Sequence, residues 1–141
     1  MEKRLKIALF AGWEDVSREN PDGPSTYRRT ASKTPALLQV SIQAIYTGGK
    51  KPDPTAQDLA GLARNLVIQK GGQVSATRGG KCKLGLFGAV QGVPPDGGFI
   101  RAWILSNGFD FVLATQTSSE QIPGDQDLQE GHAIVMNLDY R

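Results

Sequence analysis

The dipeptide Asn107-Gly108 separates two apolar runs, "IRAWILS" before it and "FDFVLATQ" after it. An Asn-Gly pair between such runs favours a type I′ turn, whose twist suits two antiparallel strands. Successive side chains of a strand point to opposite faces of the sheet. Here both faces are apolar: Ile100, Ala102 and Ile104 alternate with Trp103 and Leu105, and Phe109, Phe111 and Leu113 with Val112 and Ala114. These strands are therefore expected at the centre of a sheet, with Trp103 in the core.

Further strands are predicted on both sides of this hairpin. Residues 5–10 alternate apolar and polar side chains, and the turn-forming run "SRENPDGP" links "GWEDV" to a return strand at 25–31. Residues 36–46 place one apolar row on one face. Residues 73–93 predict two strands about the turn "RGGKCK". The apolar row of 36–46 comprises Leu38, Val40, Ile42, Ala44 and Tyr46.

Two helices are predicted, over residues 55–70 and 125–138. In the first, Thr55 and Asp58 resemble a capping box, and Gly71-Gly72 supplies a left-handed stop. Gly131 in the second permits a close approach to the sheet. The expected buried positions are Leu59, Leu62, Ala63, Leu66 and Val67 in the first helix, and Leu128, Val135 and Leu138 in the second.

This order of elements predicts one α+β domain, residues 1–141, with an antiparallel β-sheet and two packed helices. The length of 141 residues is sufficient for a core without disulfides, and 39% hydrophobic against 21% charged residues is typical of globular chains. Leu66 and Trp103 are predicted core residues.

The titratable residues do not predict an active site. Cys82 and His132 are the single cysteine and histidine and lie fifty residues apart, so neither a metal site nor a cofactor is expected. A nucleophilic pair of these two residues is a minor alternative to a buried thiol and a half-covered imidazole. The carboxylates fit turns and caps, and Thr115 and Thr117 are interpreted as part of the strand scaffold. These carboxylates are Asp22, Asp53, Asp96, Asp125 and Asp127.

Basic residues supply the candidate binding site. Seven of them could form an anion-binding patch, although a solvated surface is the simpler interpretation and nucleic acid is a disfavoured partner, because aromatic residues do not alternate with them. Residues 1–83 hold 14 Lys/Arg and 7 Asp/Glu, whereas residues 84–141 hold 2 and 7. Either this asymmetry selects a charged partner, or folding intermixes the two halves. The seven residues are Arg28, Arg29, Lys50, Lys51, Arg78, Lys81 and Lys83.

The sequence favours the cytoplasm. A lone cysteine excludes an intrachain disulfide. The basic start "MEKRLKIALFAGW" has too short an apolar run for a signal peptide and lacks a small-residue cleavage site. No run approaches the roughly 20 apolar residues of a membrane span. We expect a cytoplasmic protein without membrane contact.

Three segments together resemble a known family. An aromatic strand "RAWILSNG", its partner "FDFVLATQTSS" and a terminal helix with "AIVMNL" look like the end of PsbP-like domains, and "FAGWEDV" resembles their opening strand. These domains are α/β/α sandwiches that include a photosystem subunit, a nuclear-import factor, and adaptors of type VI secretion effectors. The resemblance extends over the order of elements in the whole chain. It implies the fold and brings no catalytic residue.

The resemblance implies binding rather than catalysis, since most such domains act by binding another protein. The expected function is a non-catalytic protein-binding domain, namely an immunity protein that neutralises a cognate bacterial toxin. The alternatives are an adaptor or chaperone of a type VI secretion effector, or a domain that binds a small molecule or anion. An enzyme is not expected.

Overall fold

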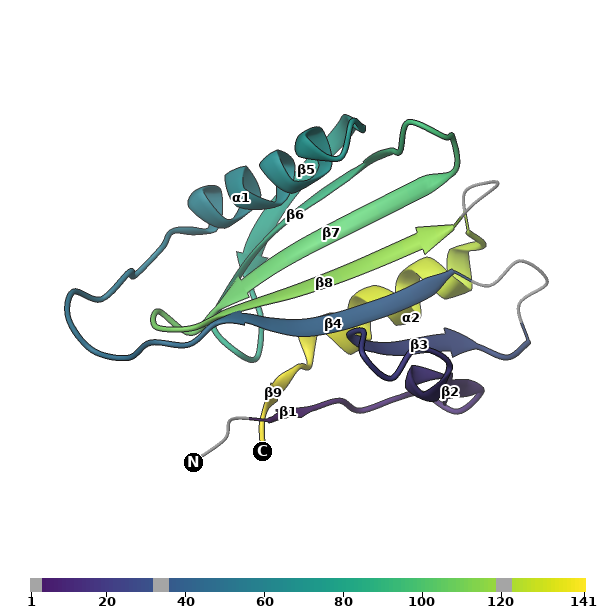
Figure 1. Cartoon of the computed structure of the whole chain (residues 1–141), viewed down its shortest axis with the longest axis horizontal. Coiled ribbons are helices and arrows are strands. Elements are labelled where there is room, and N and C mark those ends of the chain that lie inside the picture. Colours follow the sequence, from purple (N-terminus) through teal and green to yellow (C-terminus); the bar gives the residue numbers. More distant parts are fainter. Residues whose placement is uncertain (1–3, 32–35, 119–122) are drawn as a thin grey trace.

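A computed structural model describes residues 4–31, 36–118 and 123–141. Its main element is an antiparallel sheet with strand order β2-β3-β4-β8-β7-β6-β5 (Figure 1). Short strands β1 (Leu5–Lys6) and β9 (Asp139–Tyr140) pair beside it, and a 3₁₀ turn follows β2. The main strands are β2 (Trp13–Asp15), β3 (Ser25–Arg29), β4 (Leu37–Ala44), β5 (Gln73–Lys81), β6 (Leu86–Val93), β7 (Phe99–Ser106) and β8 (Phe111–Ser118).

Two helices cover opposite faces of this sheet. Helix α1 (Ala56–Gln69) packs on β5, β6 and β7, while α2 (Asp125–Met136) packs on the other face (Figure 1). The sorting follows the alternation of β7, because Ile104 clusters with α1 residues and Trp103 with α2 residues. The predicted α+β fold with an antiparallel sheet and two packed helices is confirmed.

The central hairpin is confirmed, but its turn is not type I′. Ser106 pairs with Phe111, so four residues connect β7 to β8. A type I′ turn needs positive φ at both central residues, and only Gly108 has it, at +95°. Asn107 instead uses its side chain, whose Oδ1 accepts from the backbone N–H groups of Phe109 and Asp110 at 3.0 and 2.8 Å. This local bonding competes with the two-residue turn.

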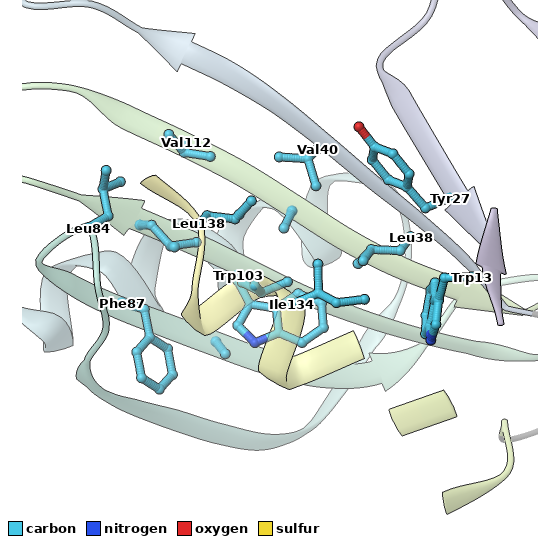
Figure 2. Packing of buried hydrophobic residues seen from close by; sticks show 14 residues of the cluster. Trp13, Tyr27, Leu38, Val40, Leu84, Phe87, Trp103, Val112, Ile134 and Leu138 are labelled. Atoms are coloured by element: carbon cyan, nitrogen blue, oxygen red, sulfur yellow. The ribbon is translucent and has the colours of Figure 1, made fainter. Parts of the chain in front are cut away.

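The core on the α2 face is built around Trp103, which is fully buried as predicted. Ile134 and Leu138, from α2 and the residues after it, pack with it against strand residues such as Leu38 and Phe87 (Figure 2). Leu128, expected to be buried in α2, is only half-buried, and Ile134 takes the deeper position. Gly131 is confirmed as a contact point, since an added Cβ would lie 2.7 Å from Nε2 of Gln116.

The core on the α1 face contains Leu59, Ala63 and Val67, and the capping box of Thr55 and Asp58 is present at the start of the helix. Leu62 was expected in this core but is 46% exposed, and Leu66 is half-buried. At about 100° per residue, Leu62 points roughly 110° away from the centre of the buried arc, and Leu66 lies on its margin.

Three boundaries differ from prediction. The segment 5–10 forms backbone pairs only at Leu5–Lys6, although its burial alternates as expected. The turn between β5 and β6 follows Cys82 rather than lying on "RGG", and hydrogen bonds between Cys82 and Gly85 close it. β4 ends at Ala44 after a bulge, so the buried row stops at Ile42 and leaves Ala44 exposed.

Candidate functional site

A small pocket lies on the α2 face, where β5, β6 and β7 meet the middle of the helix. The register places Ala76, Gln91, Arg101 and Gln116 in one cross-strand row, and Arg78, Ala89 and Trp103 in the next. Its volume is about 30 Å³, room for one or two water molecules. The lining residues are Ala76, Arg78, Phe87, Ala89, Val90, Gln91, Arg101, Trp103 and His132.

Arg101 is the most constrained charge of this pocket. One terminal nitrogen donates to Oε1 of Gln116 at 3.2 Å and to the carbonyl of Leu128 at 3.1 Å. The guanidinium carbon lies 4.9 Å from the ring centre of Trp103. Nε is buried and has no hydrogen-bond partner within the described chain. Burial, and secondarily the charge of Arg78, lowers the pKa of Arg101 to about 10.

His132 completes the pocket from α2. Its Nδ1 accepts a hydrogen bond from the indole N–H of Trp103 at 3.3 Å, and the ring of Phe87 meets it edge-on. Burial lowers the pKa of His132, and the charges of Arg101 and Arg78 lower it further. The imidazole is therefore neutral at pH 7, and its Nε2 carries the proton.

Among the described residues, the lining of the pocket holds positive charge and no carboxylate. The charge of Arg78 contributes, after burial, to the lowered pKa of Arg101, so the two arginines repel each other. A guanidinium presents several N–H donors in a fork that matches a carboxylate or phosphate. A desolvated arginine with an unused Nε, beside a second arginine, is suited to bind an anionic group.

Of the seven predicted basic residues, only Arg78 lines this pocket. Arg28 pairs with Glu14 at 2.7 Å, and Arg29 pairs with the buried Asp127. These two lie on β3, near the opposite edge of the sheet from β5.

The four lysines of that set are also dispersed. Lys51 lies over the ring of Phe109, 4.7 Å from its centre, and Lys50 is exposed beside it in the loop after β4. Lys81 is exposed at the end of β5, and the backbone of Lys83 bonds that of Met136. The structure thus distributes the seven cations over several elements.

Sequence reasoning missed Arg101 as a site residue, although one signal was present. Arg101 is the single charged residue in the apolar run 99–106, and it alternates onto the face that carries Trp103. A charge in a central strand is costly unless something compensates it. The nearness of Arg78 and His132 could not be read from the sequence, because it depends on strand order and on the face that α2 covers.

Two buried carboxylates serve the fold. Asp127, 1% exposed, holds Arg29 rather than capping the helix. The fully buried Asp110 accepts from the backbone N–H of Tyr46 and from the hydroxyl of Tyr140. No group of three or more potential metal ligands occurs among the described residues.

Cys82 and His132 do not form a hydrogen-bonded pair in the described chain. Desolvation raises the pKa of the half-buried Cys82 thiol, and His132 is bonded to Trp103 instead. A thiol with a raised pKa contains little thiolate at neutral pH, and the thiolate is the nucleophile. This geometry gives no support to a nucleophilic dyad.

Comparison with known proteins matches the fold. No family model and no curated protein matches the sequence. Among solved structures, the chain is similar to the cyanobacterial PsbP (CyanoP) of Synechocystis sp., with a TM-score of 0.58 at 13% identity, over 97% of this chain and 86% of that one. None of the described helices is long and apolar enough to cross a membrane. The chain therefore has an α+β fold similar to that of PsbP.

Proposed function

We propose that the protein is a non-catalytic domain that binds another protein through an acidic group of that partner, received at Arg78, Arg101 and His132. The observation that carries this proposal is the buried guanidinium of Arg101, which faces a second arginine and has an unused Nε. A partner's carboxylate would relieve the repulsion between the two arginines and supply the missing acceptor.

The size of the pocket supports binding over catalysis. A volume of about 30 Å³ accommodates a carboxylate tip but not a whole substrate. In the described part of the chain, His132 accepts its hydrogen bond from Trp103 and bonds no nucleophile. We therefore place the function in an extended contact surface, of which the pocket is one anchor.

Within this class we propose an immunity protein that neutralises a cognate bacterial toxin, with a type VI effector adaptor as the alternative. Both act in the cytoplasm by covering another protein. A free carboxylate or phosphate would satisfy the same pocket, so a small-anion binding domain is the competing possibility that the test must separate.

The test compares small anions with a protein partner. Backbone amide shifts of the wild type are followed while sodium acetate or inorganic phosphate is added, and binding to the purified product of the neighbouring gene is measured by calorimetry. Arg101→Met should abolish the shifts around the pocket and weaken partner binding about 100-fold or more, as expected for a buried charged contact. Arg64→Met, an exposed charge on α1, is the matched control and should leave both unchanged.

Two outcomes contradict the proposal. Partner binding that survives Arg101→Met and Arg78→Met with unchanged affinity would exclude the pocket as an anchor. Saturable binding of acetate or phosphate, combined with no binding of the neighbouring product, would favour the small-anion domain.

Cys82→Ser should bind the partner as the wild type does, since the thiol lies outside the pocket lining.

A further inference from the structure

The sheet ends in a long open edge beside the pocket. β5 spans nine residues and, among the described strands, pairs only with β6, whereas the opposite edge strand, β2, has three. β2 also carries Glu14 and Asp15, and Glu14 is occupied by Arg28. The two edges therefore differ in length and in charge.

The register shows which backbone groups of β5 point outward. Cys82 and Gly85 exchange hydrogen bonds with each other at 3.0 and 3.1 Å, so bonded and non-bonded pairs alternate from there along the hairpin. Gly80 and Arg78 consequently bond β6. The N–H and C=O groups of Thr77, Gly79 and Lys81 face away from it, and within the described chain no strand covers them.

Helix α1 leaves this edge accessible. Its contacts are centred on β6, with fewer to β5 and β7, and Figure 1 shows it lying along the face of these strands. All β5 residues except Val74 and Gly80 are exposed. An unpaired edge of this length is a template for another strand.

The charge beside the edge selects the chemistry of that strand. Arg78 is exposed on the α2 face of β5, in the row next to Arg101, and Lys81 lies at the end of the strand. An added strand would bring every second side chain to about 5 Å from its neighbour on β5 at the Cβ atoms. Acidic side chains on the α2 face would then meet Arg78, which also lines the Arg101 pocket.

We propose that an extended acidic segment of the partner adds to β5 as an eighth strand, with its carboxylates on the α2 face directed to Arg78 at the β5 side of the pocket. This inference rests on the proposed function and adds the binding mode. Main-chain hydrogen bonds to Thr77, Gly79 and Lys81 would provide affinity, and Arg78 would select for acidic residues.

The experiment uses a probe peptide of alternating valine and glutamate, which presents all its carboxylates on one face when extended. Amide hydrogen exchange and amide shifts of the wild-type protein are recorded with this peptide at up to ~1 mM. The expected result is slower exchange at Thr77, Gly79 and Lys81, with shifts at Arg78. An alternating valine–lysine peptide should bind at least about 10-fold more weakly, because Arg78 repels it.

A backbone variant tests the strand addition itself. Thr77→Pro removes an outward N–H that β6 does not use, so the fold should remain while peptide binding falls about 10-fold. Thr77→Val keeps the N–H and should bind as the wild type does. Circular dichroism and the melting temperature confirm folding, and the exchange data on wild type decide the question if Thr77→Pro does not fold.

The first three outcomes test the binding mode separately from the proposed function. Binding that needs Arg101 but leaves exchange at Thr77 and Gly79 unchanged would overturn strand addition and keep the anionic pocket. Equal protection by a valine–glutamine peptide would overturn the selection of acidic residues. Self-association without peptide, detected by sedimentation and lost in Thr77→Pro, would assign the edge to a second copy and overturn the proposal. No binding of peptide, acetate, phosphate or neighbouring product would overturn both.

Discussion

The two faces of the central sheet are built differently. The face under α1 is apolar where the helix packs, with Leu59 and Ile104 in its cluster. The face under α2 is apolar around Trp103 but polar toward the start of the helix, where Arg101 and Gln116 lie. A face that only stabilises the fold needs no charge, since buried charge costs free energy unless it is compensated. This difference is why we propose the binding site in the polar half of the α2 face.

The two faces also differ in how the helices approach the sheet. On the α1 face, an added Cβ at Gly88 would lie 1.9 Å from the backbone nitrogen of Ala60, so the helix backbone rests directly on β6. On the α2 face, Gly131 meets the side chain of Gln116, which bonds Arg101 and the carbonyl of Asp127. The first contact fixes a backbone distance, and the second positions a polar network.

Truncating a core side chain should give the largest loss of stability, and this loss should be similar on both faces of the sheet. Trp103→Ala is expected to lower the free energy of unfolding by about 3–5 kcal/mol and Leu59→Ala by about 2–5 kcal/mol, because each fully buried side chain leaves a cavity. Denaturant unfolding measures both. Leu62→Ala, an exposed position of the same helix, is the control and should cost much less. Equal losses at Leu59 and Leu62 would contradict the assigned face of α1.

Breaking the buried ion pair between Arg29 and Asp127 should destabilise the polar half of the α2 face. Asp127→Asn is expected to cost about 3 kcal/mol, because it leaves Arg29 without its partner carboxylate. The same denaturant measurement applies, with Glu14→Gln at the exposed pair with Arg28 as control. That control should change stability by less than about 1 kcal/mol. A harmless Asp127→Asn would show that the pair contributes little.

Matched glycine-to-alanine substitutions should change stability in opposite directions in the two helices. Gly131→Ala is expected to destabilise by about 1–3 kcal/mol, because its Cβ meets Gln116. Gly61→Ala in α1 should stabilise by about 0.5–1 kcal/mol, since nothing lies within 4 Å of the added Cβ and alanine favours helix. Thermal and chemical unfolding of both variants check the signs. A stabilising Gly131→Ala would show that α2 can shift without cost.

The smallest expected effect is a pH dependence at His132. Because its folded pKa is lowered, the unfolded chain binds this proton first as pH falls through about 6.5, and stability declines by at most about 1.4 kcal/mol per pH unit until the folded pKa is reached. This contribution is fully present above pH 6.5. His132→Gln should flatten the dependence of the unfolding free energy on pH between pH 5.5 and 7.5.

The same residue reports on the proposed anion. As the single histidine of the chain, His132 gives unambiguous ring signals in NMR titrations. An anion bound beside Arg101 should raise the pKa of His132, because the anion offsets the charges of Arg78 and Arg101. A pKa above 6.5 in the unbound protein would contradict the buried, repelled environment.

Local chemistry allowed much of the fold to be predicted. The alternation of residues 100–105 assigned the two faces of β7 correctly, and Thr55 with Asp58 marked the start of α1. These signals are short-range, since they depend on side-chain direction along one element. The prediction of a type I′ turn at Asn107-Gly108 was wrong, because the side-chain hydrogen bonds of Asn107 favour a four-residue loop.

What the sequence determined by itself was the class of fold and the two apolar faces of the hairpin. Only the tertiary structure decided which charges meet. Arg78 and Arg101 are 23 positions apart and face the same pocket because β6 lies between their strands and α2 brings His132 over them. The same strand order leaves β5 at an edge. Strand order reflects the packing of the whole chain, which no local pattern specifies.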